Sequence, residues 1–320
     1  MTAIQTVPTD VGAAAITTTG LTKTYPGAAV DAVDRLDLSI PPGVVYCLLG
    51  RNGAGKTTTI RMLTTLLSPS SGTAEVLGIP LHEVRRLRPL IGVALQEVAL
   101  DPWLNAREQL DLGLAMAGWP RAERRPRVAA LVEQFGLGDF QNRRIGSLSG
   151  GMRRRVDVAL AVSHDPLLLF LDEPSSGLDI EGKDEVWRVI AQLRSEGRTV
   201  VLTTHDMEEA VALADQVGII KAGALVASGP ADDLTRAHGA RAVVTADREI
   251  APNVADELRA AGFTVADSAD GARALTIELP TANAAHLGRL TDVLGRNDLS
   301  AAEVRVESTS LRDAFLEATR

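Results

Sequence analysis

Short apolar runs and alternating apolar and polar positions dominate the chain between residues 16 and 98. They predict strands, and consecutive apolar residues after position 166 are typical of parallel strands that are buried on both faces. Helices are expected at 58–67 and 181–196, so the pattern favours an α/β fold. The predicted strands span 17–23, 32–40, 44–49, 73–77, 91–95, 167–171 and 199–204, with a closing hairpin at 217–229.

Residues from about 99 to 165 have a helical pattern instead. It predicts helices over 103–119, 124–135 and 153–163, separated by turns that contain glycine or proline. This helical insert separates two halves of the predicted sheet.

The order of elements changes again after residue 235. Strands at 241–246, 264–266, 274–279 and 303–307 and helices at 254–261 and 283–294 follow one another as β-α-β-β-α-β. That order predicts a small ferredoxin-like α+β domain over 236–320, with one extra helix at 311–319. The core domain then spans 16–235, and residues 1–15, which are small and polar, are expected to be disordered. We expect the C-terminal domain to regulate the protein or to pair chains.

Composition narrows the class of protein. The chain has 320 residues, of which 45% are hydrophobic, enough for one large or two ordinary domains. Its formal net charge of -8 argues against binding to nucleic acid through the overall field, so no nucleic-acid partner is expected.

Cysteine content and hydropathy bear on the compartment. Cys47 is the only cysteine, and its place in a predicted strand indicates a buried, unreactive thiol. No apolar run approaches the roughly 18 to 20 residues of a membrane-spanning helix. The first 15 residues lack the pattern of a signal peptide. The chain is therefore expected in the cytosol, with membrane attachment only through a partner.

One loop carries a phosphate-binding pattern. Residues 50–57 read Gly-Arg-Asn-Gly-Ala-Gly-Lys-Thr between a predicted strand and a predicted helix, which is the context that G-x-x-x-x-G-K-[ST] requires. The glycines let successive N–H groups face one anion, while Lys56 adds a charge and Thr57 a hydroxyl for Mg²⁺. A chance match is the competing interpretation. The loop predicts binding of a nucleoside triphosphate, but it leaves kinases, GTPases and motor ATPases open.

Two carboxylates, Asp172 and Glu173, end the apolar strand at 167–171. Two acids at the mouth of a core strand are costly unless a cation lies there. With Mg²⁺ present, Asp172 can hold the ion through its hydration shell, and Glu173 can polarise a water for attack on the γ-phosphate. The structural alternative is that both acids cap a helix.

Three other residues have competing interpretations. Gln96 and His205 end predicted strands at the same edge as Asp172, where ligands collect in open α/β sheets. Gln96 could instead be an exposed loop residue, and His205 a structural histidine. Tyr25, upstream of the phosphate loop, could pack in a turn or stack on a base.

The segment 148–152 reads Leu-Ser-Gly-Gly-Met and precedes the third helix of the insert. Ser149 is a candidate N-cap, and the two glycines leave N–H groups open to an anion, although a simple cap explains the segment equally. The insert is also rich in arginine, which favours either a solvated helix face or a docking surface for acidic loops or lipid headgroups. These arginines are Arg121, Arg124, Arg125, Arg127, Arg143, Arg144, Arg153, Arg154 and Arg155.

Together these motifs resemble the ATP-binding subunit of ABC transporters over residues 16–235. The resemblance implies a P-loop NTPase core with an antiparallel β subdomain and the helical insert. In the terms of that family, the Walker A loop is 50–57, the Q-loop glutamine is Gln96, the signature is 148–152, the Walker B strand is 167–173, the D-loop is 176–179 and the switch histidine is His205.

The resemblance also implies ATP and Mg²⁺ as cofactors and assigns residues to them. Catalytic roles fall to Glu173, Gln96 and His205, and Mg²⁺ contacts to Thr57, Gln96 and Asp172. Tyr25 is implied to stack on the adenine. The implied ATP contacts are Tyr25, Gly50, Asn52, Gly53, Gly55, Lys56, Thr57, Thr58, Ser149, Gly150, Gly151 and Asp179.

The chain departs from the family at Met152, where glutamine is usual, although Ser149 and Gly151 are intact. Met152, the arginines that follow it and the short C-terminal domain look most like the daunorubicin-resistance-type branch of multidrug exporters. The resemblance thus implies an ATPase that powers export of drugs or antibiotics from the cytoplasmic face of the cell membrane.

Its implied partners are an integral membrane permease and a second copy of this chain, with two ATP molecules held head to tail between the copies. Two alternatives stay open. A soluble ABC-type ATPase that acts on ribosomes or DNA tends to carry two ATPase units or long coiled coils, whereas this chain has one phosphate loop and no sustained heptads. An import subunit usually has a longer C-terminal domain.

Overall fold

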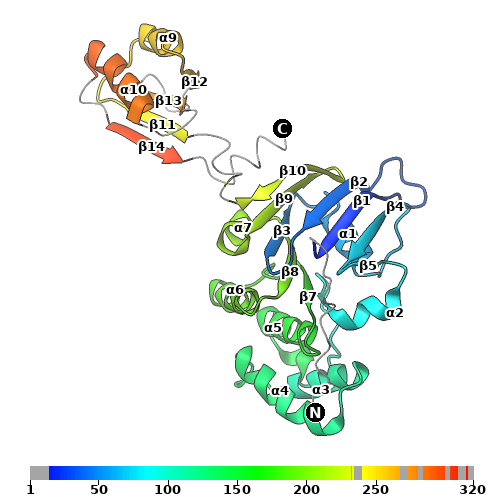
Figure 1. Cartoon of the computed structure of the whole chain (residues 1–320). Helices are drawn as coiled ribbons and strands as arrows, with labels where there is room; N and C mark the ends of the chain where they lie inside the picture. The colour runs from blue at the N-terminus through cyan, green and yellow to red at the C-terminus, as the bar shows by residue number, and fades with distance from the viewer. Residues whose placement is uncertain are drawn as a thin grey trace. The chain divides into compact units, whose positions relative to one another are not determined.

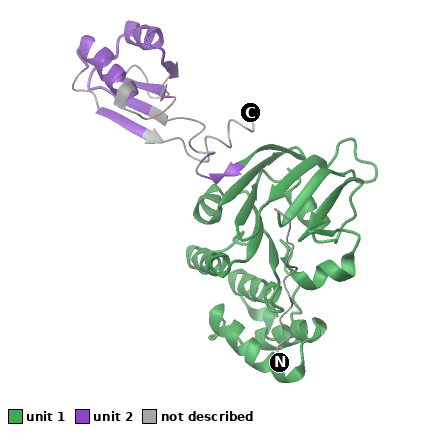
Figure 2. Ribbon diagram, in the orientation of Figure 1, with its two compact units in different colours: residues 1–228 green, residues 229–320 purple. Residues whose placement is uncertain are grey.

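The computed structural model describes residues 14–231, 233, 240–266, 273–279, 284–299, 303–308 and 315. The chain forms two compact units, residues 1–228 and 229–320 (Figure 2). The division lies inside strand β10 (Ala224–Pro230), a few residues before the boundary expected at 235. Within unit 1, a six-stranded and a four-stranded sheet lie next to a group of helices (Figure 1).

The central sheet of unit 1 has the strand order β10-β9-β3-β8-β7-β6. Its inner strands β3, β7 and β8 consist entirely of buried residues, as the continuous apolar runs predicted, and β3 pairs in parallel with both β8 and β9. Likewise β7 pairs in parallel with β6 and β8. The strands are β3 (Val45–Leu49), β6 (Ile91–Ala94), β7 (Leu168–Asp172), β8 (Thr199–Thr204) and β9 (Gln216–Lys221).

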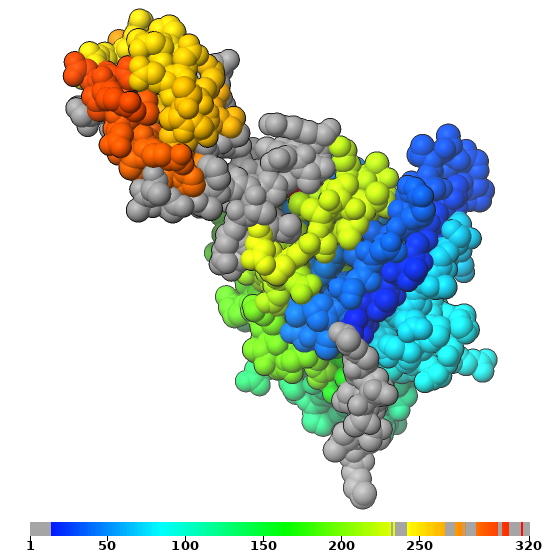
Figure 3. Space-filling model, turned by 45° about the horizontal axis from the view of Figure 1, so that its top comes forward, coloured from blue at the N-terminus to red at the C-terminus, as the bar shows by residue number. Residues whose placement is uncertain are grey.

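A second, antiparallel sheet has the order β2-β1-β4-β5, with β1 (Ile16–Lys23), β2 (Val33–Ile40), β4 (Ser71–Val76) and β5 (Ile79–Pro80). Its surface forms a continuous blue and cyan band in the space-filling view (Figure 3). Ala15 is fully buried, and its N–H donates to the Ile40 carbonyl, so the expectation of disorder is wrong for Ala15. Residues 1–13 of that expected segment lie outside the described residues.

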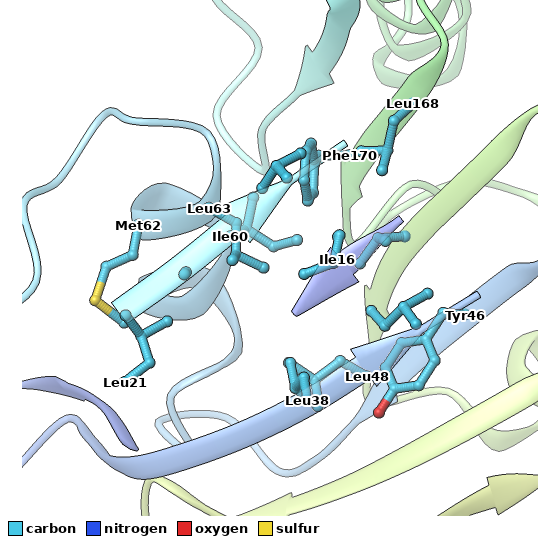
Figure 4. Packing of buried hydrophobic residues seen from close by; sticks show 14 of the residues in the cluster. Ile16, Leu21, Leu38, Tyr46, Leu48, Ile60, Met62, Leu63, Leu168 and Phe170 are labelled. Carbon is cyan, nitrogen blue, oxygen red and sulfur yellow. The ribbon is translucent and has the colours of Figure 1, made fainter. Parts of the chain in front are cut away.

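One hydrophobic cluster joins the two sheets through helix α1 (Lys56–Leu63). Side chains of β1, β2, β3, α1 and β7 gather there, among them Tyr46, Ile60 and Phe170 (Figure 4). Because side chains alternate along a strand, Tyr46 and Leu48 face this cluster and Cys47 faces the other side of the sheet. Burial raises the pKa of the Cys47 thiol well above its usual range. The cluster fixes α1, and hence the loop before it, against the sheet.

The helical insert contains α3 (Ala106–Met116), α4 (Arg121–Gln134) and α5 (Gly150–Ala161). Asn105 caps α3 in a capping box with Glu108. Helix α5 begins at Gly150, three residues before the expected start. The prediction missed this first turn because it contains two glycines, which have a low helix propensity. Among the described residues, the short α-helices α2 (Val84–Leu87) and α7 (Met207–Leu213) were not predicted, whereas α6 (Ile180–Ser195) follows the sequence pattern.

Unit 2 has the predicted β-α-β-β-α-β order: β11 (Ala240–Thr245), α9 (Pro252–Ala260), β12 (Thr264–Ala266), β13 (Ala274–Leu279), α10 (Ala284–Arg296) and β14 (Glu303–Ser308). Its antiparallel strand order, β12-β13-β11-β14, is that of a ferredoxin-like sheet and confirms the predicted fold. The expected helix at 311–319 lies outside the described residues. Among the described helices of both units, none combines the length and apolarity needed to cross a bilayer.

Candidate nucleotide-binding site

The carboxyl ends of four parallel strands meet at one edge of the central sheet. Leu49 lies opposite Thr204, Asp172 opposite Thr203, and Ala94 opposite Leu171. The residues that follow these ends are therefore neighbours: the phosphate loop after β3, Gln96 after β6, Glu173 after β7 and His205 after β8. This is the edge at which the sequence predicted a site.

The glycines of the phosphate loop allow close backbone approaches. Gly55 adopts a φ of 107°, and a Cβ atom there would lie 2.4 Å from the Ala32 carbonyl oxygen. A Cβ on Gly50 would lie 2.7 Å from Cγ2 of Ile220. A side chain at Gly50 would push the loop away from β9, and one at Gly55 would push it away from Ala32, the residue before β2. The N-terminus of α1 then points its free N–H groups into the loop.

Lys56 is the first residue of α1 and only 5% exposed. Its Nζ donates to the carbonyl oxygens of Gly50 at 2.9 Å and Arg51 at 3.2 Å, and lies 3.4 Å from Oε1 of Glu173. The backbone oxygens thus aim the ammonium across the loop toward the end of β7. A buried cation in this position favours a phosphate or carboxylate beside it.

Glu173 is the meeting point of the predicted catalytic residues. It is 7% exposed; Oε2 accepts from Nε2 of Gln96 at 3.3 Å, and Oε1 lies 3.2 Å from Nδ1 of His205. Its backbone has a φ of 50°, in the left-handed region that a non-glycine residue enters at a cost. The N–H of Glu173 is held by Thr203, through both its carbonyl oxygen and its Oγ1. The fold therefore fixes this carboxylate against three partners.

Asp172 is fully buried at the end of β7. Its Oδ1 accepts from the hydroxyl of Thr203, whereas its Oδ2 is buried and accepts no hydrogen bond from the described residues. An orphaned carboxylate oxygen at this edge fits a hard cation and its water shell, as the sequence predicted for Mg²⁺. The structural alternative for these two acids, a helix cap, does not apply, because no described helix begins at either residue.

A cavity of about 360 Å³ opens beside the loop. Tyr25 lies close to it, since its hydroxyl is 3.4 Å from Oγ1 of Thr58; the residue is 38% exposed, and its ring lies beside Nζ of Lys23. An exposed aromatic ring at this place is available for stacking. A larger cavity, near the amino end of β7, contains none of the predicted site residues. The 360 Å³ cavity is lined by Ala32, Asn52, Gly53, Gly55, Lys56, Thr57, Thr58, Gln96 and Glu173.

The signature segment lies apart from this cavity. Ser149 caps α5 by accepting from the N–H of Met152, which confirms the predicted N-cap, and Gly150 is exposed with open space beside it. Asp179 similarly caps α6 through the N–H of Gly182. Among the described residues, no hydrogen bond, ion pair or cavity lining joins Ser149, Gly150, Gly151 or Asp179 to the phosphate loop.

Sequence reasoning missed several buried polar residues behind the site. Arg154 is 4% exposed and contacts the ends of β6 and β7, so neither a solvated face nor a docking surface describes it. Other arginines of the insert are also held within the chain, such as Arg127 by the Val162 and Ser163 carbonyls and Arg155 by Glu185. The spacing of Arg154 and Asp157, three apart on one helix, was the available indication of a pair.

A second missed group links the segments after Glu173 and His205. Nε1 of Trp187 donates to Oγ of Ser175 at 2.8 Å and lies 3.3 Å from Oε1 of Glu209, and the Ser175 hydroxyl also donates to Glu209. Burial raises the pKa of Glu209, and hydrogen bonds from Ser175 and Thr204 partly offset that rise. This network joins α6, α7 and the loop after β7.

Comparison with known protein families and sequences gives a consistent result. Residues 33–176 match the family model described as ABC transporter. The daunorubicin/doxorubicin resistance ATP-binding protein DrrA of Streptomyces peucetius is 38% identical over 320 residues, covering 95% of this chain and 92% of that protein. The Nod factor export ATP-binding protein I of Cupriavidus metallidurans is 42% identical over 203 residues, covering 63% of this chain and 67% of that protein.

Solved structures agree. The dimeric structure of a bacterial ABC transporter cassette has a TM-score of 0.63 and 27% identity, covering 67% of this chain and 98% of its own. The dimeric structure of a post-hydrolysis state of the same cassette, bound to ADP and Pi, also has a TM-score of 0.63, with 26% identity and a coverage of 67% and 98%. Phosphate loop, strand-end acids, overall fold and relatives all agree: this chain belongs to the ATP-binding, ATP-hydrolysing proteins of the ABC transporter family.

Proposed function

We propose that this chain is the energy-coupling subunit of an exporter of drugs or antibiotics and that it works with an integral membrane permease. In this proposal it lies at the cytoplasmic face of the cell membrane. The support is the likeness to a daunorubicin/doxorubicin resistance protein over nearly the whole of both chains, unit 2 included. The subunit would supply the free energy of ATP hydrolysis, and the permease would choose the transported molecule.

The ATP-hydrolysing role within this proposal is supported by the convergence of Lys56, Gln96 and His205 on Glu173. Lys56 and the N–H groups of the loop would hold the phosphates, and Tyr25 would stack on the adenine. Glu173 would accept a proton from the attacking water, while Gln96 and His205 orient the carboxylate and the γ-phosphate.

Mg²⁺ is the metal that the donor set fits. The Thr57 hydroxyl, the Gln96 amide and the orphaned oxygen of Asp172 are all oxygen donors at the same edge of the sheet. The ion would neutralise charge on the phosphates when bound. Thr203 keeps the other oxygen of Asp172 engaged and so fixes the direction of the free one.

A second copy of the chain would complete the site. Ser149 and Gly150 are exposed at the capped N-terminus of α5, Gly151 is partly exposed, and Asp179 is exposed at the N-cap of α6. A head-to-tail pair would place these residues of one copy against the ATP held by the other. Binding would then be strongest with the γ-phosphate present, and hydrolysis would release the pair.

Light scattering coupled to size-exclusion chromatography tests this arrangement. The Glu173→Gln variant should shift from monomer to dimer only when Mg-ATP is present. A dimer that persists without nucleotide would instead assign pairing to unit 2. A monomer under both conditions would contradict ATP-driven closure of the isolated chain.

Transport tests the drug-export part of the proposal. Inside-out membrane vesicles from the source cells should accumulate daunorubicin when ATP is added, and vesicles from cells that carry Glu173→Gln in this chain should not. Equal accumulation in both would contradict the export role, while leaving the ATPase assignment standing. Recovery of the chain with ribosomes or DNA and not with membranes would favour the soluble ATPase instead.

A further inference from the structure

Arg154 lies in α5, the helix that begins within the signature segment, five residues after the Ser149 cap, and is 4% exposed. A buried arginine must have its donors satisfied, because five N–H groups away from water are costly to leave unpaired. All its described partners are backbone carbonyls of the strand ends and one acidic side chain. It is therefore held by the edge of the sheet at which the site lies.

The guanidinium contacts the backbone on both sides of Glu173. Its Nη2 donates to the carbonyl oxygen of Asp172 at 2.6 Å, and its Nε donates to the carbonyl oxygen of Pro174 at 3.2 Å. Its Nη1 donates to the carbonyl oxygen of Leu95, the residue before Gln96. One side chain thus brackets the residues that carry the Gln96–Glu173 hydrogen bond, from outside the cavity.

The charge of Arg154 is balanced by Asp157, three residues later on the same helix, at 2.9 Å from Nη1. Burial raises the pKa of Asp157 to about 6 and lowers the pKa of Arg154, so the desolvation of both partners exceeds what their attraction returns. Buried ion pairs of this kind contribute little to stability. A contribution to stability therefore does not explain why a guanidinium is buried here. Its hydrogen bonds to three carbonyls at the ends of two strands suggest that it holds these strand ends in place.

We propose that Arg154 is a positioning residue that keeps Gln96 and Glu173 at fixed places relative to the signature helix. This inference rests on the proposed catalytic roles of Gln96 and Glu173. A displacement of the signature helix is then transmitted through one rigid, planar group to the ends of β6 and β7. The fork matters as much as the charge, because a lysine cannot reach three carbonyls in fixed directions.

The Arg154→Lys variant tests the proposal, with Arg127→Lys as the matched control. Arg127 also donates to two backbone carbonyls, those of Ser163 at 2.9 Å and Val162 at 3.1 Å, but it lies on α4 and touches no predicted site residue. Turnover of Mg-ATP by the full chain is measured per site that binds a fluorescent ATP analogue, so that misfolded molecules do not count. The affinity for the analogue is measured in the same titration.

The expected result is a loss in kcat of about 100-fold for Arg154→Lys, since a misplacement of about 1 Å near the reacting atoms has an effect of that size. The affinity for the analogue should stay unchanged, because the phosphate loop is untouched. Arg127→Lys should keep the wild-type kcat. A loss of analogue binding in Arg154→Lys, or a kcat within about twofold of wild type, overturns the inference.

A double-mutant cycle of Arg154 and Gln96 distinguishes a positioning role of Arg154 from a general structural role. Arg154→Lys added to Gln96→Ala should lower kcat much less than it does in the wild type, because residues that act as a unit have non-additive effects. Independent, multiplying losses would contradict the inference and leave the proposed function standing. A wild-type chain that fails to turn over ATP even with its membrane partner would contradict the proposed function and, with it, this inference.

Discussion

Nζ of Lys56 and Oε1 of Glu173 lie 3.4 Å apart, and both side chains are almost fully buried. The lysine comes from the phosphate loop and the glutamate from the end of β7, so the contact ties two motifs that are far apart in the sequence. Each balances the charge of the other in a place where an isolated charge is costly. A phosphate that enters the loop therefore competes with Glu173 for the same ammonium group.

Replacement of Glu173 by glutamine follows from this contact. The variant loses its general base, so we expect kcat to fall roughly 100- to 10,000-fold. ATP affinity should stay the same or rise, since glutamine no longer competes for Lys56. Phosphate release and binding of a fluorescent ATP analogue measure the two effects, and full activity in the variant would refute the role of Glu173.

Asn105, which caps α3, provides a control for Ser149, which caps α5. Removal of either cap by alanine should destabilise the chain by about 1 kcal/mol. In the Glu173→Gln background, only Ser149→Ala should also lose ATP-induced dimerisation, because only Ser149 lies in the segment proposed to contact ATP on the second copy. Urea denaturation and light scattering measure the two effects. Equal dimerisation by both variants would contradict a role of Ser149 across the interface.

A comparison of alanine variants at Gly55 and Gly118 distinguishes the cost of backbone strain from the cost of a steric clash. Gly55 and Gly118 both have positive φ, at 107° and 82°, but only a Cβ on Gly55 meets a backbone atom, the Ala32 oxygen. Gly118→Ala should lose about 1 to 2 kcal/mol of unfolding free energy through conformation alone. Gly55→Ala should lose more unfolding free energy, because the clash with Ala32 is added to the strain, and it should also bind ATP more weakly. Indistinguishable stabilities in urea would mean that the loop can move away from Ala32 without cost.

The raised pKa of Asp157 leads us to expect that the stability of the chain depends on pH. Its pKa is raised by burial to about 6, above the value of 3.8 in an unfolded chain, and Arg154 only partly offsets the rise. Between these values the folded chain binds more protons than the unfolded one, so this group destabilises the fold as pH increases. Asp157→Asn cannot ionise and lacks this loss. The unfolding free energy of the variant minus that of the wild type should therefore increase from pH 4.5 to pH 7. Urea denaturation at both pH values checks this, and a difference that does not change with pH would contradict it.

Local patterns made the fold and the centre of the site predictable. The phosphate loop needs only the order of strand, glycines and helix, and the acids at 172 and 173 stand where an apolar run stops. The ferredoxin-like order of unit 2 was equally visible, because each of its elements has its own periodicity. Short elements were missed: α2 and β5 have four and two residues, too few to show a period.

The supporting residues could not be predicted, because their roles depend on how helices pack. Arg153, Arg154 and Arg155 are consecutive, and successive helical positions point about 100° apart, so only one of them can face the sheet. Which one does so depends on the rotation of α5 against β6 and β7. The left-handed backbone of Glu173 and the contact of Thr203 with Asp172 likewise arise only once the strands are paired.

The burial of Cys47 makes the chain a convenient starting point for spectroscopy. The thiol lies inside β3, its pKa is raised, and the chain has no other cysteine. The thiolate is the form that attacks electrophilic labelling reagents, so the native protein should resist labelling while it is folded. A pair of cysteines introduced on exposed residues could then carry spin labels or fluorophores without removal of a native residue, and changes in spacing between subunits could be followed during turnover.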